Sequence, residues 1–213
     1  MVVLKESIFE TPLGKVTCGI ETSEGSCDIK GETSYEHGRS QTIVTHSHSI
    51  EFITFKLRLP LYNGELVADS MGWLWRISKY SSLDESIQLH CLLNDYNDDT
   101  EFGSSPGEHL DSVEINDKNW VLHIGTEDGE IMHLRALHED GMPLRFKDDL
   151  SFHISFHKLL RNGFTTAIPK LNQGENIHFH YLSAFDKRNS ESVNTWLAVD
   201  SFKRELENWI GIW

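Results

Sequence analysis

The stretch that decides the fold runs from Trp120 to His138 and reads WVLHIGTEDGEIMHLRALH. At its centre lies Asp128-Gly129, a pair typical of type I′ hairpin turns, in which both central residues have positive φ. This turn predicts a hairpin that pairs residues 120–126 with residues 131–137. Both faces of the hairpin are largely apolar, which indicates a central place in a sandwich. A two-residue loop would also set Glu127 opposite Glu130, so the tip needs a longer loop or a positive partner.

Strand patterns continue on both sides of this stretch. Residues 50–62 and 65–69 predict a second hairpin around Asn63-Gly64, in which Leu61 faces Leu66. Alternating apolar residues predict further strands at 73–77 and 177–181. Residues 87–93 also alternate, and we favour a strand there over a helix capped by Ser82.

The end of the sequence has a helical pattern. One apolar stripe, at positions 202, 206, 209 and 213, predicts a short helix that is capped by Asp200 or Ser201. We therefore expect an α+β, mainly β fold: an antiparallel sheet or sandwich built from hairpins, with a short C-terminal helix. Residues 1–213 are expected to form a single domain. The alternative is that the long polar loop 94–111 separates two half-domains.

Acidic residues dominate the charge of the chain. Its formal net charge is −14, and residues 84–149 hold 17 of the 33 acidic residues but only four basic ones. Such a charge repels nucleic acids and anionic membranes, so neither is expected as a partner. The sequence shows no signal peptide and no apolar run that could span a bilayer. Three cysteines without a CxxC motif predict reduced thiols and a cytoplasmic protein, with a Cys18–Cys27 bridge as the alternative.

The acidic segment supplies the leading functional hypothesis. Clustered carboxylates attract a basic protein at a high association rate. We therefore expect a non-enzymatic binding protein that engages a basic partner protein, comparable in charge and size with immunity and inhibitor proteins. The residues expected to bind this partner are Asp95, Asp98, Asp99, Glu101, Glu127, Asp128, Glu130, Glu139 and Asp140.

The twelve histidines support an alternative in which the protein is a metal-dependent enzyme. Residues 45–51, THSHSIE, place His46 and His48 on one strand face and resemble the first metal motif of the cupins, which are β-barrel proteins. The resemblance implies a divalent metal held by His46, His48 and Glu51. The Glu comes earlier than in that motif, and the second cupin motif is not visible. We therefore favour a solvated sheet face for the histidine pairs and expect no cofactor.

A third hypothesis is a β-sandwich that binds a ligand or carbohydrate. It depends on Trp73 and Trp75, whose rings would have to be exposed. The sequence contains no GxSxG, HExxH or Walker A motif, so an enzyme is not the favoured reading.

Overall fold

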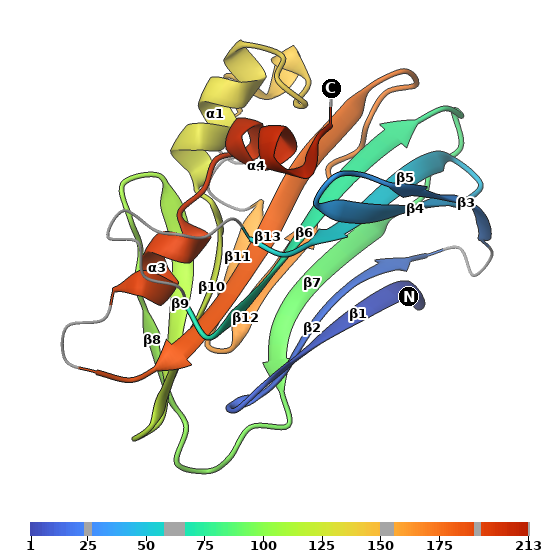
Figure 1. Cartoon of the computed structure of the whole chain (residues 1–213). Coiled ribbons are helices and arrows are strands. Elements are labelled where there is room, and N and C mark those ends of the chain that lie inside the picture. The colour runs from blue at the N-terminus through green and yellow to red at the C-terminus, as the bar shows by residue number, and fades with distance from the viewer. Residues whose placement is uncertain (24–26, 58–66, 150–155, 190–192, 213) are drawn as a thin grey trace.

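Strands form where apolar residues alternate with polar ones, and they assemble into two antiparallel sheets in the computed structural model (Figure 1). The structure describes residues 1–23, 27–57, 67–149, 156–189 and 193–212. The predicted fold class is confirmed, because the chain is mostly β, is built from hairpins and has a short C-terminal helix. Among the described helices, none has the length and apolar character needed to cross a membrane.

The smaller sheet has five strands. In spatial order they are β1 (Val2–Thr11), β2 (Gly14–Thr22), β7 (Ile87–Asn94), β12 (Gly163–Ala167) and β11 (His157–Leu160). The directly paired Cys18 and Cys91 are both buried in it, whereas Cys27 is exposed. All three are free thiols, so the alternative Cys18–Cys27 bridge is wrong.

The larger sheet has eight strands. In spatial order they are β3 (Asp28–Ser34), β4 (Gly38–Val44), β5 (His48–Phe55), β6 (Asp69–Lys79), β13 (Asn176–Lys187), β10 (Trp120–Glu127), β9 (Leu110–Asn116) and β8 (Glu101–Ser104). Strands from before and after residues 94–111 take part in both sheets. That segment was expected to be one long loop, but it contains β8 and the start of β9, so this part of the prediction is wrong.

The core lies between the two sheets. The predicted strands at 73–77, 87–93 and 177–181 are confirmed as parts of β6, β7 and β13. Alternate residues of β6 and β13 point to the smaller sheet and are fully buried, and the rings of Phe52 and Trp75 stack at 4.0 Å. Trp73 and Trp75 therefore belong to the core, and the expectation that their rings are exposed is wrong.

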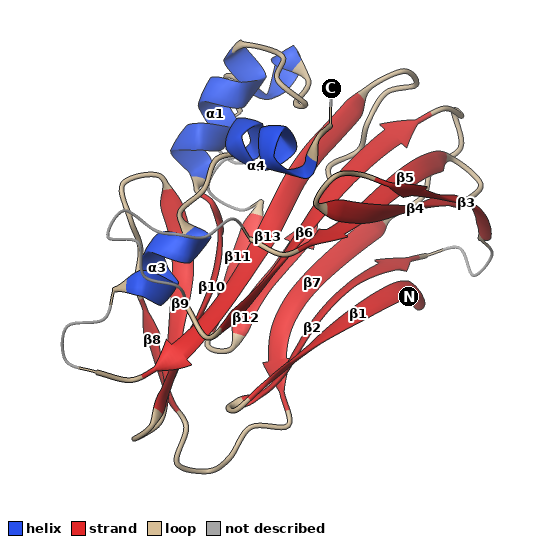
Figure 2. Cartoon of the chain, in the orientation of Figure 1, coloured by secondary structure: helices blue, strands red, loops and turns tan. Residues whose placement is uncertain are grey.

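Helices form a third layer on the other face of the larger sheet (Figure 2). They are α1 (Gly129–Leu137), α3 (Asn194–Val199) and α4 (Lys203–Ile210), with a short 3-10 turn at Leu144–Phe146. Beneath α3 and α4 lies a second apolar cluster, which includes Leu74, Leu182, Val199, Leu206 and Ile210. The central strands of the larger sheet are therefore covered on both faces. We call its face toward the smaller sheet the inner face and its face toward the helices the outer face.

The predicted hairpin at Trp120–His138 is wrong, because its second half is the helix α1. Strand β10 already pairs with β9 on one edge and β13 on the other, so no edge is left for residues 131–137. Asp128 instead caps the helix, and its side chain accepts a hydrogen bond from the Ile131 N–H at 3.0 Å. Glu130 lies in the first helical turn, so it does not face Glu127 across a hairpin.

Two other predictions concern the β5–β6 pairing and the position of the C-terminal helix. The Asn63-Gly64 turn and its flanking residues lie outside the described part, but β5 and β6 pair from Phe55 with Gly72 to His48 with Lys79. The same register, continued toward the turn, would pair Leu61 with Leu66 as the sequence predicts. The C-terminal helix begins at Lys203 after Phe202, and its buried side is formed by positions 203, 206 and 210. The expected stripe is therefore shifted, since Phe202 is exposed.

Candidate functional site

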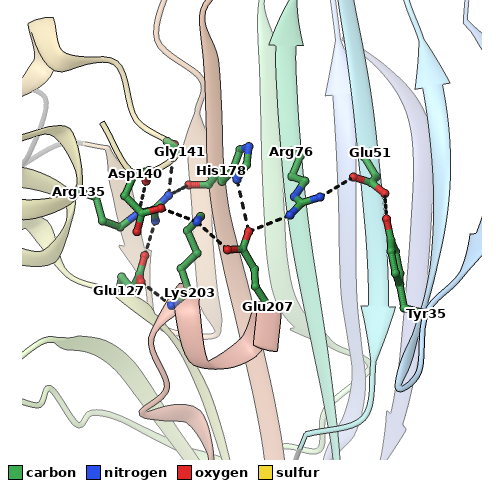
Figure 3. A network of polar contacts seen from close by, with 10 residues as sticks. All are labelled: Tyr35, Glu51, Arg76, Glu127, Arg135, Asp140, Gly141, His178, Lys203 and Glu207. Carbon is green, nitrogen blue, oxygen red and sulfur yellow. Dashed lines mark hydrogen bonds and ion pairs between the residues drawn. The ribbon is translucent and has the colours of Figure 1, made fainter. Parts of the chain in front are cut away.

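A network of charged side chains runs across the outer face of the larger sheet, beneath α1 and α4 (Figure 3). Its centre is Glu127, at the end of β10, whose side chain is 3% exposed. One carboxylate oxygen of Glu127 pairs with the guanidinium of Arg135 on α1. The other accepts the backbone N–H of Lys203 at 2.9 Å. Because this N–H belongs to the first turn of α4, the carboxylate also interacts favourably with the helix dipole.

Arg135 holds the surrounding backbone in place. Its guanidinium donates to the carbonyl oxygens of Asp140 at 3.1 Å and Gly141 at 3.3 Å, and also to the carbonyl oxygen of His178. Burial acts to raise the pKa of Glu127, but the nearby cations, of which Arg135 contributes most, and the hydrogen bonds from Arg135 and the Lys203 N–H together hold that pKa below its usual value. The pair is thus ionised at neutral pH and joins α1, β10 and β13.

Lys203 extends the network along the sheet. Its ammonium group lies 2.7 Å from Asp140 Oδ1 and 2.8 Å from Glu207 Oε2. The other oxygen of Glu207 accepts from Arg76 Nη2 at 3.0 Å, and Arg76 Nη1 reaches Glu51 at 3.3 Å. Burial acts to raise the pKa of Glu207, but its hydrogen bonds and the nearby cations keep it well below its ordinary value. Each of these charges is therefore matched by a neighbour of opposite sign.

Histidines of the same face are buried under the helices. His180 is 1% exposed, and among the described residues neither of its ring nitrogens has a hydrogen-bond partner of normal geometry. Burial lowers the pKa values of His178 and His180, and it lowers the pKa of His123 to about 4. His123 Nδ1 lies 2.9 Å from Thr195 Oγ1. The interpretation of the 178/180 pair as part of a solvated sheet face is therefore wrong, because helices that the strand pattern does not reveal cover it.

A cavity of about 190 Å³ opens between α1 and the start of α4, directly above the Glu127–Arg135 pair. Apolar side chains form much of its wall, and charged groups form its base and rim. The lining residues are Glu127, Ile131, Leu134, Arg135, His138, Asp140, Phe202, Lys203 and Arg204.

The surface around this cavity exposes apolar side chains. Leu134 and Leu137 of α1 are 40% and 46% exposed, and Phe202 is 38% exposed. Three exposed carboxylates, those of Glu130, Glu139 and Asp140, belong to α1 and the turn that follows it. We call these six residues together with the cavity the α1/α4 face. Its centre is apolar, and the three carboxylates and the exposed Arg204 surround it.

The acidic residues expected to bind a partner do not form one surface. Asp95, Asp98, Asp99 and Glu101 are all exposed, and they lie in or next to the connection from β7 to β8. Glu101 pairs with Asn116, whereas Glu127 pairs with Leu110 at the other end of β9. The two acidic groups are thus at opposite ends of the sheet. Within the second group, Glu127 is buried in an ion pair and Asp128 caps α1, which leaves Glu130, Glu139 and Asp140 on the surface.

The residues of the metal hypothesis also lie apart. His46 is exposed, and His48 is buried with its Nδ1 3.2 Å from Glu85 Oε2. Glu51 binds Arg76 and accepts a hydrogen bond from Tyr35 Oη at 2.6 Å. Across the described ranges, no three His, Cys, Asp or Glu side chains are grouped so that they could hold a metal ion.

His48 instead takes part in a buried carboxylate cluster that sequence reasoning missed. Glu85, whose side chain is 1% exposed, accepts hydrogen bonds from Thr22 and Thr45 at 2.5 Å and from Ser47 at 2.6 Å. Burial acts to raise the pKa of Glu85, but these hydrogen bonds lower it to about 2. Thr22 belongs to the smaller sheet, His48 begins β5 of the larger sheet, and Thr45 and Ser47 lie in the turn between β4 and β5, so the cluster joins the two sheets.

The Ser47, His48 and Glu85 side chains are not arranged as a catalytic triad. Ser47 Oγ lies 2.8 Å from His48 Nδ1, and Glu85 Oε2 approaches the same ring nitrogen. A triad needs the serine and the carboxylate at different nitrogens of the imidazole. Ser47 and His48 are also buried, so the cluster is assigned a structural role.

Sequence reasoning also missed Arg76, Lys203 and Glu207. The only local signal is the spacing of Lys203 and Glu207, which are four residues apart on a helix. The remaining contacts join residues that are distant in sequence.

Comparisons of the chain with protein-family models, curated proteins and solved structures found no match.

Proposed function

We propose that the chain is a non-enzymatic binding protein that takes a basic partner protein on the α1/α4 face. The observation that carries the proposal is the exposure of Leu134, Leu137 and Phe202 around a cavity. The exposed carboxylates of Glu130 and Glu139 lie on the same face. Apolar side chains of a partner would fill the cavity, and its Lys or Arg side chains would face Glu130 and Glu139.

The base of the cavity supports binding rather than catalysis. Glu127, Arg135 and Lys203 are engaged with one another or with Asp140 and Glu207. Groups held in this way make a rigid wall, which lowers the entropic cost of binding. The proposed partner is a basic protein of the kind that an immunity or inhibitor protein blocks, and the proposed location is the cytoplasm.

Under this proposal the partner binds the acidic group that includes Glu130 and Glu139 and not the group that includes Asp98 and Asp99. The two groups can therefore be compared directly. The probe is a synthetic amphipathic helix of Leu and Lys, titrated at low salt by calorimetry. The double variant Glu130→Lys/Glu139→Lys is compared with Asp98→Lys/Asp99→Lys, which makes the same change of charge at the other end. We expect the first variant to weaken binding by about tenfold and the second to change it by less than about twofold.

A third variant tests the apolar contact, because Phe202→Ala leaves the charge unchanged and removes one wall of the cavity. We expect this variant to bind the same probe more weakly, because the probe loses an apolar contact in the cavity. The proposal fails if the wild-type protein does not bind the probe at low salt. It also fails if the two charge variants weaken binding equally, because the effect is then one of net charge alone.

A further inference from the structure

A second candidate surface lies where the larger sheet extends past the edge of the smaller sheet. It is formed by other residues than the α1/α4 face. The strand β1 forms one edge of the smaller sheet. Its Ser7 accepts a hydrogen bond from Trp73 Nε1 of β6 at 3.0 Å, and the Phe9 ring contacts the Trp73 ring edge-on. Strand β1 therefore lies opposite β6, while β5, β4 and β3 continue the larger sheet beyond it (Figure 1).

A groove with a cavity of about 290 Å³ lies between β1 and these three strands. Because side chains alternate along a strand, Lys5 and Ser7 share the inward side of β1 with the core residue Phe9. The pairing of Arg39 with Thr54 and Gln41 with Phe52 places these four residues on the inner face of β4 and β5. The residues that line the groove are Lys5, Glu6, Ser7, Glu32, Arg39, Ser40, Gln41, Phe52 and Thr54.

The edge of β1 that borders the groove is open. Within the described ranges, β1 pairs with β2 alone, and it is ten residues long. Val2, Val3 and Ile8 are 47%, 52% and 52% exposed. A long edge strand with exposed β-branched residues is a template for pairing with another strand. Its register shifts between Val3 and Lys5, so the regular part of the edge is Lys5–Thr11.

The charge of the groove indicates what would pair there. In the described part of the chain, neither Lys5 nor Arg39 has an ion-pair partner, although both line the groove. The carboxylate of Glu32 already accepts from Gln41 Nε2 at 2.5 Å, and that of Glu6 lies 3.7 Å from His90 on the opposite side of β1. Glu32 keeps its negative charge in this hydrogen bond, so the inward-facing groups of the groove are two cations, Lys5 and Arg39, against one carboxylate. A carboxylate that enters the groove therefore meets a net positive charge.

From these observations we propose that β1 accepts an extended acidic segment of another polypeptide as an additional strand of the smaller sheet. Backbone hydrogen bonds to the open edge would supply affinity, and alternate side chains of the segment would lie over Thr54 and Gln41. A carboxylate on that side would pair with Lys5 and Arg39.

The test uses a short acetylated peptide with Glu and Thr on one side of the strand and Val on the other. Binding is measured by fluorescence anisotropy, and hydrogen exchange reports whether the amides of residues 5–11 become protected. We expect that replacing Glu by Lys in the peptide, or Arg39→Glu in the protein, weakens binding by about tenfold. The matched control Lys30→Glu changes the same charge on β3 outside the groove lining and leaves the affinity unchanged.

The backbone contribution is tested on the peptide, so that folding of the protein is not disturbed. Methylating alternate amide nitrogens removes the donors on one edge of the peptide. We expect the peptide methylated on the edge that faces β1 to lose binding. The proposal is overturned if both methylated forms bind like the parent, if Arg39→Glu and Lys30→Glu act alike, or if the groove binds a linear oligosaccharide such as maltohexaose and not the peptide.

Discussion

The carboxylate of Glu127 accepts the backbone N–H of Lys203 at 2.9 Å, so the end of β10 holds the beginning of α4. The same side chain pairs with Arg135 of α1. One buried carboxylate therefore fixes both helices that border the α1/α4 face, and the shape of that face depends on a residue that a partner would not need to touch.

Replacing Glu127 by Gln keeps an acceptor for Lys203 but leaves the buried guanidinium of Arg135 without its counter-charge. We expect the free energy of unfolding to fall by about 3 kcal/mol, since removal of one partner strands the other charge in the interior. Urea unfolding at neutral pH measures this loss. The matched variant Glu139→Gln changes an exposed carboxylate and should cost less than about 0.5 kcal/mol. Equal losses for the two variants would contradict the role given to Glu127.

His123 makes folding depend on pH in the acidic range. Burial lowers its pKa to about 4 in the folded protein, whereas the unfolded chain takes up the proton near the ordinary value of 6.5. The stability that its neutral form contributes is complete above pH 6.5 and is lost as the pH falls toward 4. This contribution is about 3 kcal/mol. The imidazole signal in an NMR titration tests the assignment, and a midpoint near pH 6.5 would refute it.

Glu85 is expected to hold the two sheets together. In Glu85→Leu, the hydroxyls of Thr22, Thr45 and Ser47 and the ring of His48 lose a shared acceptor. We expect a loss of about 3 kcal/mol in thermal or urea unfolding, because buried polar groups are left unsatisfied. The neighbouring Asp84, whose side chain is 68% exposed, provides the control Asp84→Asn, with a cost below about 1 kcal/mol. A small effect of Glu85→Leu would show that water replaces the carboxylate.

The sequence predicted the fold class because alternation along strands depends on local residue order. The segments around Trp75, Leu89 and Phe179 show this, since each has one face in the core. The same reasoning failed at Asp128-Gly129, because Asp is as suitable at a helix N-cap as in a hairpin turn. The choice between the two depends on whether β10 has a free edge, and strand order is not a local property.

The candidate site was only partly predictable. Glu130, Glu139 and Asp140 were identified from charge, and they are at the surface of the α1/α4 face. The network beneath was not identified, because contacts such as Arg76 to Glu207 join residues far apart in the chain. The pair His178 and His180 was misinterpreted because a strand pattern does not show which of its faces a helix will cover.

Coverage of the central strands of the larger sheet on both faces has a consequence for how the sequence can change. In β13, Phe179 lies in the core between the sheets, whereas His178 and His180 lie under the helices. Deleting one residue would exchange these two sides, so a phenyl ring would enter the charged layer and an imidazole ring would enter the core. No described helix covers the outward side of the smaller sheet (Figure 2). We therefore expect insertions and deletions among natural variants to be rare in β6 and β13, and substitutions to be tolerated best on the outward side of β1, where Glu6, Ile8 and Glu10 are exposed.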